Sequence, residues 1–421
     1  MNTTSNLPAI LASRRRFLGQ AGAMGILALG AQAPGFWARA AQGAVNRDGR
    51  ILVLLQLAGG NDGLNTVIPH TRDEYYRLRP SLAVPKGAAL KLNDELSLNP
   101  QLVGLKELHD QGLLSIIQGV GYPAPNRSHF RSMDIWHSAV PTKEHTRDGW
   151  LGRAMDAAAN SLVGQVPALA LETGPLPLAL VAGRTSVPTI QGVQDYRLSG
   201  GAGDALEQQR KRSLIGSLAN HRGTGANDAD DDLAFLRRTA TTAIATAKRI
   251  EASASHKPTK PYPATGLGRR LETIARFIAA DVGPQVYFVS LDGFDTHSDQ
   301  AQAHNALLTE LGGATRAFFR DLEASGLAKR VLLATFSEFG RRVKENGSLG
   351  TDHGAASQMF LMSGGIAPTI HGSHPSLTDL DEGDLKHHTD FRQVYATLLE
   401  QWLGWPSEPA LLGRFKQLKL G

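Results

Sequence analysis

The sequence predicts an α/β protein of three layers, in which helices cover both faces of a mostly parallel central sheet. Six short apolar runs end in glycine or polar residues, as strands buried on both faces do. Segments with apolar residues at three- and four-residue spacing lie between these runs, and alternating strands and helices are typical of parallel sheets. A chain of 421 residues, 42% of them hydrophobic and 20% charged, also has enough apolar residues for a large core.

The predicted strands follow one another after residue 50. They are residues 50–60, 112–123, 166–173, 285–293, 330–338 and 358–365. The predicted helices include residues 99–112, 301–325 and 391–403. Residues from about 196 to 282 interrupt the alternation, and no apolar run there is long enough for a separate sheet. We therefore predict one domain, residues 41–421, with a helical insertion at about 196–282.

The first forty residues have the features of an export signal. Arg14 and Arg15 stand shortly before Phe17, a weakly apolar stretch follows, and residues 38–40 read Ala-Arg-Ala, like a cleavage site. Paired arginines in this place are typical of the twin-arginine signal, an address read by a translocase. The stretch is rich in glycine and contains Pro34, which makes it a poor membrane-spanning helix. We predict a signal peptide at residues 1–40, export by the twin-arginine translocase, and a periplasmic or secreted mature protein that is not integral to the membrane.

The charge and cysteine content argue against a nucleic-acid-binding protein and against a protein held together by disulfides or thiolate zinc sites. The net charge is +5, and the first forty residues contain four arginines and no acidic residue, so the mature chain carries 5 − 4 = +1. Such a chain lacks the strongly basic surface that nucleic-acid binding requires. The chain has no cysteine, which excludes disulfides and thiolate zinc sites. Any bound metal is therefore held by His, Asp, Glu or hydroxyl groups.

Polar side chains follow the predicted strands where ligands of parallel α/β proteins bind, beyond the carboxyl ends. Any one of these residues could have a purely structural role, because Asp and Gly favour turns and Ser and Asp favour helix N-caps. Their occurrence together favours a ligand-binding site. The residues are Asp62, Ser128, Asp295, His297, Asp352, His353 and His388.

This set of carboxylates, imidazoles and one hydroxyl suits one or two divalent cations. Zinc is favoured, with manganese or calcium as alternatives. Paired metals can activate a hydroxyl nucleophile and stabilise charge on a transferring group, and Ser128 at a helix N-terminus is the candidate nucleophile. Arg127, Arg131 or Arg341 would bind the free oxygens of a phosphate or sulfate ester, or they are ordinary exposed arginines.

Five segments resemble, in order, those of the domain-of-unknown-function 1501 family, exported bacterial proteins that often carry twin-arginine signals. The segments are LVLLQLAGGNDGLNTVIPH, NRSHFRSMDIWHSA, VSLDGFDTHSDQ, FSEFGRRVKENGSLGTDHG and HHTDFRQVYATLLEQWLG, and the resemblance runs from about residue 50 to 410. That family is in turn similar, more remotely, to the alkaline phosphatase and sulfatase superfamily. The resemblance implies an alkaline phosphatase-like fold.

The superfamily implies a role for each matched residue. Ser128 would be the nucleophile, Asp62, Asp352 and His353 would hold the second metal, and Asp295, His297 and His388 would complete the first. The superfamily usually separates this last Asp and His by three residues, whereas Asp295 and His297 are separated by one. Asp292, separated from His297 by four residues, is an alternative ligand.

The sequence thus predicts an exported metal-dependent hydrolase that cleaves an anionic phosphate or sulfate ester through Ser128. Maturation to formylglycine, which needs a C/S-x-P-x-R pattern, is not expected, because His129 and Phe130 follow Ser128. The alternative is a non-catalytic exported scaffold or binding protein that keeps the fold. The short spacing of Asp295 and His297 favours this alternative.

Overall fold

A nine-stranded mixed sheet forms the centre of the computed structural model, which describes residues 49–142, 146–158, 167–183, 185, 187, 189–190 and 257–420. The strand order within this part of the chain is β11-β5-β10-β9-β1-β8-β6-β7, and β14 pairs with β5. The strands are β1 (Ile51–Ala58), β5 (Leu114–Gly121), β6 (Ala168–Leu171), β7 (Thr189–Ile190), β8 (Val286–Asp292), β9 (Val331–Phe336), β10 (Ser357–Met362), β11 (Ile370–His371) and β14 (Thr389–Asp390).

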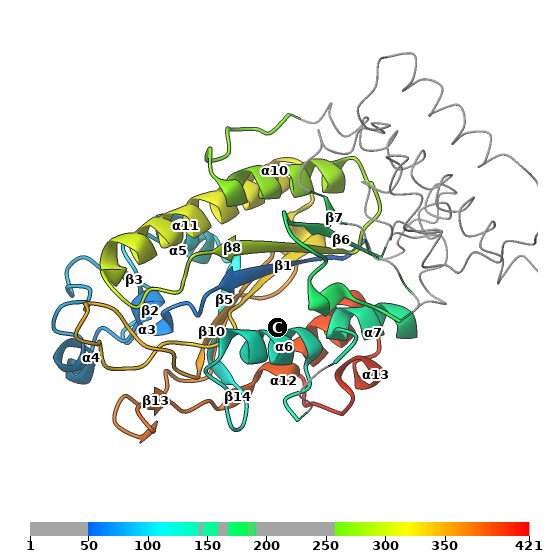
Figure 1. The fold of residues 1–421 in the computed structure, drawn as a ribbon. Helices are drawn as coiled ribbons and strands as arrows, with labels where there is room; N and C mark the ends of the chain where they lie inside the picture. The colour runs from blue at the N-terminus through cyan, green and yellow to red at the C-terminus, as the bar shows by residue number, and fades with distance from the viewer. Residues whose placement is uncertain are drawn as a thin grey trace, which may run out of the picture.

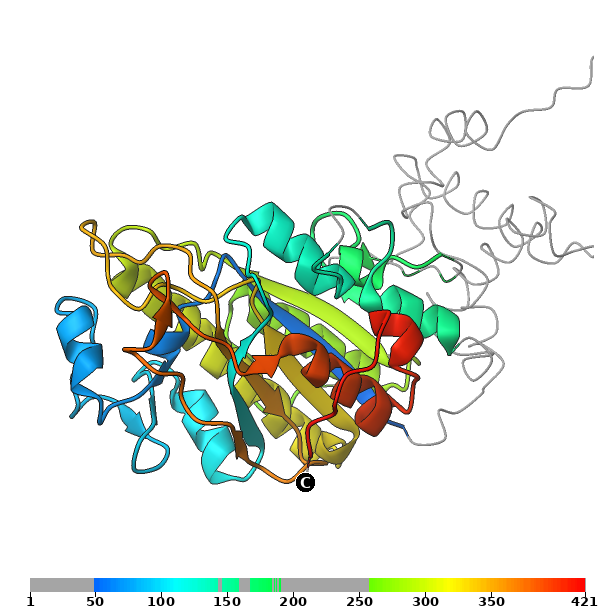
Figure 2. The same cartoon turned by 90° about the horizontal axis from the view of Figure 1, so that it is seen from below.

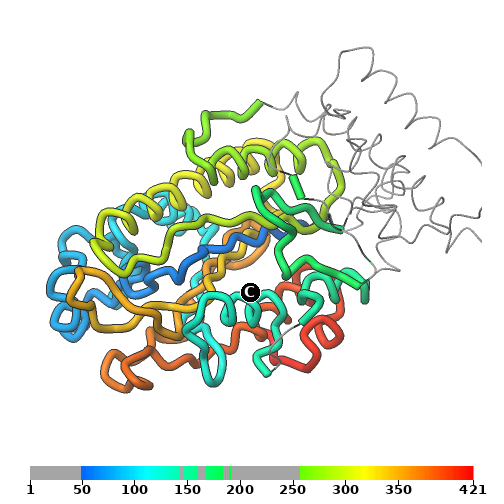
Figure 3. The backbone as a smooth tube through the Cα atoms, viewed as in Figure 1, coloured from blue at the N-terminus to red at the C-terminus, as the bar shows by residue number. Residues whose placement is uncertain are grey.

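Most of the strands are parallel. Among the described strands of this sheet, only β10 runs antiparallel to its neighbours, β5 and β9, whereas β1 pairs in parallel with both β8 and β9. In Figure 3 the blue tube of β1 passes through the middle of the molecule. The predicted α/β fold with a mostly parallel sheet is confirmed, and each of the six predicted strands is present.

Helices cover both faces of the sheet, because the side chains of a strand alternate between its faces. Val53 and Leu55 of β1 face one core, and Leu52 and Leu54 face the other. Figure 1 shows α10 and α11 above the sheet and α6, α7, α12 and α13 below it, and Figure 2 shows the lower layer in front. The upper helices are α5 (Val103–Asp110), α10 (Gly266–Ala279) and α11 (Gln300–Ala324); the lower ones are α6 (His129–Ser138), α7 (Trp150–Ala157), α12 (Phe391–Thr397), η5 (Leu398–Leu403) and α13 (Glu408–Leu411).

The predicted insertion at about 196–282 lies mainly outside the described residues, and the predicted signal at 1–40 lies wholly outside them. The described end of the insertion contains α10, which buries Leu271, Ile274 and Phe277 in the same core as Val53. The last part of the predicted range therefore belongs to the helical layer that covers the sheet.

A smaller region with its own apolar cluster adjoins the loop after β1. Leu64, Ile68, Tyr75, Leu377 and Leu385 pack together there. Its elements are α3 (Gly63–Thr66), α4 (Asp73–Leu78), the short strands β2 (Val67–Ile68), β3 (Leu90–Lys91) and β4 (Ser97–Leu98), and the hairpin of β12 (Leu380–Asp381) and β13 (Asp384–Leu385). Across the part of the chain that the structure describes, no helix combines the length and apolarity needed to span a bilayer.

Candidate metal centre

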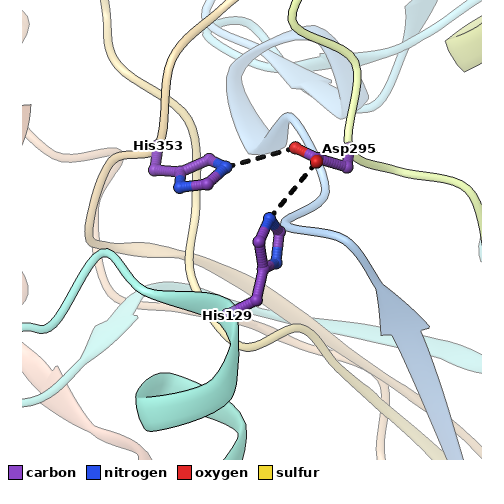
Figure 4. Close-up of side chains that lie close together, drawn as sticks. All are labelled: His129, Asp295 and His353. Carbon is purple, nitrogen blue, oxygen red and sulfur yellow. Dashed lines mark hydrogen bonds and ion pairs between the residues drawn. The ribbon is translucent and has the colours of Figure 1, made fainter.

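Three side chains from separate loops converge at the carboxyl edge of the sheet. His129 opens α6, Asp295 follows β8, and His353 lies in the segment between β9 and β10. One ligand atom from each lies within 4.8 Å of the other two (Figure 4). The carboxyl ends of β1, β5, β8 and β9 share this edge because these strands run in the same direction.

His129 is oriented by a buried carboxylate. Its Nδ1 lies 3.0 Å from Oε1 of Glu338, a fully buried residue that also accepts from the backbone N–H of Gly59 at 2.8 Å. With Nδ1 held by Glu338, the other ring nitrogen, Nε2, points toward Asp295. That Nε2 is buried, makes no hydrogen bond, and lies 3.4 Å from Oδ2 of Asp295.

His353 is oriented in the same way by a backbone carbonyl. Its Nδ1 donates to the carbonyl oxygen of Arg127 at 2.7 Å, and its Nε2 lies 3.1 Å from Oδ1 of Asp295. Burial lowers the pKa of the His353 ring, although the contact with Asp295 opposes this effect. The neutral ring that results presents its lone pair at Nε2, which is the form that binds metals.

Asp295 is the carboxylate shared by these histidines. Its Oδ1 also accepts from Nη2 of Arg341 at 2.8 Å. Burial alone raises the pKa of Asp295, but the hydrogen bond and charge of Arg341, together with the contact with the His353 ring, outweigh it and lower the pKa to about 2. Asp295 is therefore ionised at neutral pH.

His297 lies beside these three residues. Its Nε2 is 3.1 Å from Oδ1 of Asp295 and 2.8 Å from Nε2 of His353. Its Nδ1 faces Oδ1 of Asp352 at 3.4 Å, and Asp352 also accepts from the side chain of Asn346 at 3.1 Å. Asp352 thus contacts an outer nitrogen of His297 rather than the convergence point. The short spacing of Asp295 and His297 still lets both face that point, and Asp295 rather than Asp292 contacts His297.

Ser128 directly precedes His129 and is exposed. It occupies the N-cap position of α6, but its side chain makes no capping hydrogen bond. Its backbone N–H donates to Oδ1 of Asn126 at 2.8 Å, which fixes the turn into the helix. The hydroxyl therefore stands at a helix N-terminus next to a converging histidine.

The three predicted anion-binding arginines all make contacts within the chain. Arg341 is buried and donates to the carbonyl groups of Gly59, Gly60, Phe294 and Thr351, so it ties together the loops after β1, β8 and β9.

Arg127 donates to Asp384 and Glu382 of the β12–β13 hairpin, and Arg131 donates to the carbonyl of Pro141 at 2.7 Å. The guanidinium groups thus brace loops in this structure.

Asp62 and His388 are not brought to the convergence point. Asp62 is buried and accepts from Arg79 and Gln300, each at 2.5 Å. Burial raises the pKa of Asp62, but the charge and hydrogen bond of Arg79 outweigh it and the net pKa is lowered. His388 has Nε2 2.9 Å from the carbonyl of Ser373, and its Nδ1 lies 3.1 Å from the hydroxyl of Thr389.

Sequence reasoning missed His129 and Glu338. Both stand in segments quoted for the family resemblance, NRSHF and FSEFG, and both follow a predicted strand. The available signal was therefore their position at the carboxyl ends of β5 and β9. The neighbouring Ser128 and Arg341 were assigned roles instead.

The donor set fits a divalent transition metal. The Nε2 atoms of His129 and His353 both face Asp295, and a cation between these nitrogens and the carboxylate would be attracted to all three groups. Imidazole nitrogen and carboxylate oxygen are ligands of zinc and manganese, whereas calcium takes oxygen ligands. His129, Asp295 and His353 would hold the ion, and His297 is placed to be a fourth ligand.

The fold and this cluster define an α/β protein with a candidate metal centre at the carboxyl edge of its sheet. The chain belongs to the DUF1501 family of proteins of unknown function, whose family model matches residues 50–404. The family resemblance predicted from the five segments is confirmed. A comparison with curated proteins gave no match.

Several solved structures resemble the fold. A sulfatase from Pseudoalteromonas sp., PsFucS1, has a TM-score of 0.41 and 10% identity. The match covers 92% of this chain and 76% of the sulfatase chain. A protein of the alkaline phosphatase superfamily from Vibrio parahaemolyticus has a TM-score of 0.39 and 10% identity, with coverages of 87% and 69%. The alkaline phosphatase of the Antarctic bacterium TAB5 has a TM-score of 0.30 and 10% identity, with coverages of 76% and 93%. These likenesses concern the fold alone.

Proposed function

We propose that this chain is an exported metal-dependent hydrolase of phosphate or sulfate esters, with one divalent cation held by His129, Asp295 and His353. The observation that carries the proposal is the buried Nε2 of His129, which makes no hydrogen bond and faces Asp295 at 3.4 Å. A buried polar nitrogen without a hydrogen bond is costly to folding, and a bound cation removes that cost. Zinc suits the donor set best, and manganese is the alternative.

The residues around the ligands prepare them for a metal. Glu338 contacts Nδ1 of His129, and the carbonyl of Arg127 accepts from Nδ1 of His353. Such outer partners fix the ring orientation and raise the basicity of the ligand nitrogen. Arg341 keeps Asp295 ionised. At neutral pH Asp295 is thus ionised, and burial favours the neutral ring of His353, as metal binding requires.

Ser128 is the proposed nucleophile. It is exposed, stands at the N-terminus of a ten-residue helix, and directly precedes a ligand. The positive end of the helix dipole favours the ionised hydroxyl. The serine oxygen would bond to the phosphorus or sulfur as the alcohol oxygen leaves, and the serine proton would end on that alcohol. Water would then cleave the serine ester. A bound divalent cation would supply charge stabilisation for the ester oxygens.

A metal-binding protein without hydrolytic activity is the second candidate. The guanidinium groups of Arg127 and Arg341 are engaged by carboxylates and carbonyls of this chain, so neither stands ready to bind an anionic ester. This arrangement favours a scaffold that retains the metal for stability.

Metal content and ester hydrolysis test the proposal together. The mature chain and its His129→Ala variant would be purified, analysed for zinc and manganese, and assayed with an aryl phosphate and an aryl sulfate. His109→Ala, on α5 and outside the cluster, is the matched control. We expect metal in the wild type and the control, and its loss in His129→Ala. A metal-free wild type contradicts the metal centre.

The role of Ser128 is tested separately. Ser128→Ala should keep metal and fold, since even a true N-cap contributes only about 1 kcal/mol. The same change should lower ester hydrolysis by several orders of magnitude, because the covalent route is lost. Equal rates for Ser128→Ala and wild type would refute the nucleophile. A metal-loaded wild type that cleaves no ester would favour the binding protein.

A further inference from the structure

The β12–β13 hairpin holds the loop that leads into α6 through one arginine. Nε of Arg127 donates to Oδ2 of Asp384 at 2.8 Å, and Nη2 lies 2.6 Å from the same oxygen. Nη1 of Arg127 donates more loosely to Glu382 at 3.3 Å. Asp384 is almost fully buried, whereas the side chain of Arg127 is 34% exposed. The strongest contact of this arginine is therefore with a carboxylate on β13, 257 residues away in sequence.

Arg127 also contacts the metal centre through its backbone. Its carbonyl oxygen accepts from Nδ1 of His353 at 2.7 Å. The side chain of one residue is thus fixed to the hairpin while its carbonyl sets the tautomer of a proposed ligand. Two residues further on, His129 supplies a second proposed ligand from the same short segment. A displacement of this segment would move an outer partner and a ligand together.

We propose that Asp384 is a positioning residue for the metal centre, which acts through Arg127 to direct Nε2 of His353 toward the ion. Asp384 touches neither the ion nor the proposed ligands. This inference rests on the proposed function, because it assumes that His353 binds a metal.

The contacts of Asp384 allow its positioning of His353 to be distinguished from a purely stabilising role in the fold. Oδ1 of Asp384 makes no hydrogen bond and lies 3.7 Å from Nε of Arg342, so the carboxylate is committed mainly to Arg127. Replacing the carboxylate by an amide keeps its shape but removes the charge that attracts the guanidinium. If Asp384 only braced the fold, this change would affect stability and leave the metal affinity of the folded protein unaltered. If it positions His353, metal affinity falls in the folded protein.

The test is a double-mutant cycle read out as zinc affinity. Zinc binding to the mature chain would be measured by competition with a chromogenic chelator for wild type, Asp384→Asn, His353→Ala and the double variant. Asp381→Asn is the matched control, since Asp381 is an exposed acid on the same hairpin. Thermal unfolding in EDTA would show that each variant is folded before metal is added. Arg127→Lys, which keeps the charge and the carbonyl but loses the planar fork, is the second variant should Asp384→Asn fail to fold.

We expect Asp384→Asn to weaken zinc binding about tenfold or more, as outer partners of metal ligands do. Asp381→Asn should bind zinc like the wild type. In the His353→Ala background Asp384→Asn should cause a smaller loss than in the wild type, because only the effect that passes through His129 remains. Wild-type affinity in folded Asp384→Asn, or an equal loss in both backgrounds, overturns the inference while leaving the metal centre intact. A wild type that binds no zinc overturns the proposed function itself.

Discussion

The Nε2 atoms of His297 and His353 lie 2.8 Å apart. Two ring nitrogens at this distance need a proton or a cation between them. Nδ1 of His353 donates to the carbonyl of Arg127, so the lone pair of its neutral ring is at Nε2. In the metal-free protein His297 therefore has to donate from its own Nε2. A metal ion would take the place of that proton, which makes His297 a conditional ligand.

The first prediction ranks the histidines. His297→Ala should weaken zinc binding less than His129→Ala does. Nε2 of His297 has a hydrogen-bond partner in the metal-free protein, so binding the ion requires it to give up that hydrogen bond. His129, in contrast, has a buried Nε2 that makes no hydrogen bond. Chelator competition on both variants measures the difference. A larger loss for His297→Ala than for His129→Ala would show that the ion is centred elsewhere.

The second prediction concerns Asp62, whose carboxylate is occupied by Arg79 and Gln300. Asp62→Asn should leave zinc content unchanged but lower the free energy of unfolding by roughly 3 kcal/mol, since it leaves the buried Arg79 without its counter-ion. Asp94→Asn, at an exposed surface ion pair, is the control. Urea unfolding and metal analysis of the same samples decide the matter. Loss of zinc with unchanged stability would make Asp62 a ligand, as the superfamily resemblance implies.

The third prediction concerns Arg341, which binds the carbonyls of three loops. Arg341→Lys should lower the free energy of unfolding by roughly 3 kcal/mol or more, because an ammonium group cannot reach all of these buried acceptors. It should also reduce zinc affinity through Asp295. Arg414→Lys, whose arginine side chain is 85% exposed, should change neither quantity. An unchanged urea midpoint for Arg341→Lys would contradict the bracing role.

The fourth prediction is a loss of stability in mild acid. Burial lowers the pKa of His137, His304 and His374 to about 4, from an ordinary value of 6.5. Above pH 6.5 these rings are neutral in both the folded and the unfolded chain, so no stability is lost. Between pH 6.5 and about 4 the unfolded chain binds protons that the folded chain does not, and stability falls as the pH falls. Each histidine contributes about 1 kcal/mol per pH unit in this window.

Urea unfolding at pH 7.5 and pH 5 in the presence of EDTA isolates this effect from metal binding. His137→Gln should reduce the pH dependence, because one of the buried rings that resist protonation in the folded chain is removed. A free energy of unfolding that stays constant between these pH values would show that the buried rings are charged or accessible in the folded state.

The strands could be predicted because their apolar runs are local features. Residues 51–58 are buried almost throughout, and a continuous apolar run of this length needs no distant partner to be recognised. The position of the site was also predictable, since parallel strands bring their carboxyl ends to one edge. Asp295 and His353 were identified on that ground and lie together in the structure.

The roles of single polar residues were harder to predict, because distant partners decide them. Asp62 and Asp295 both follow buried strands, yet Asp62 meets Arg79 and Gln300 inside the protein, whereas Asp295 faces histidines. Gln300 is 238 residues from Asp62, and no local pattern announces this contact. His129 was passed over for a related reason: its proposed ligand role depends on Glu338, 209 residues away, which orients its ring.

The proposed metal centre holds one ion at the convergence of His129, Asp295 and His353. The most direct measurement is the anomalous scattering of zinc from crystals of the mature chain grown with the metal. A single strong peak about 2 Å from Nε2 of His129, Nε2 of His353 and a carboxylate oxygen of Asp295 is the predicted result. The absence of a peak there, or a peak within bonding distance of Asp62 or His388 instead, would contradict the proposed metal centre.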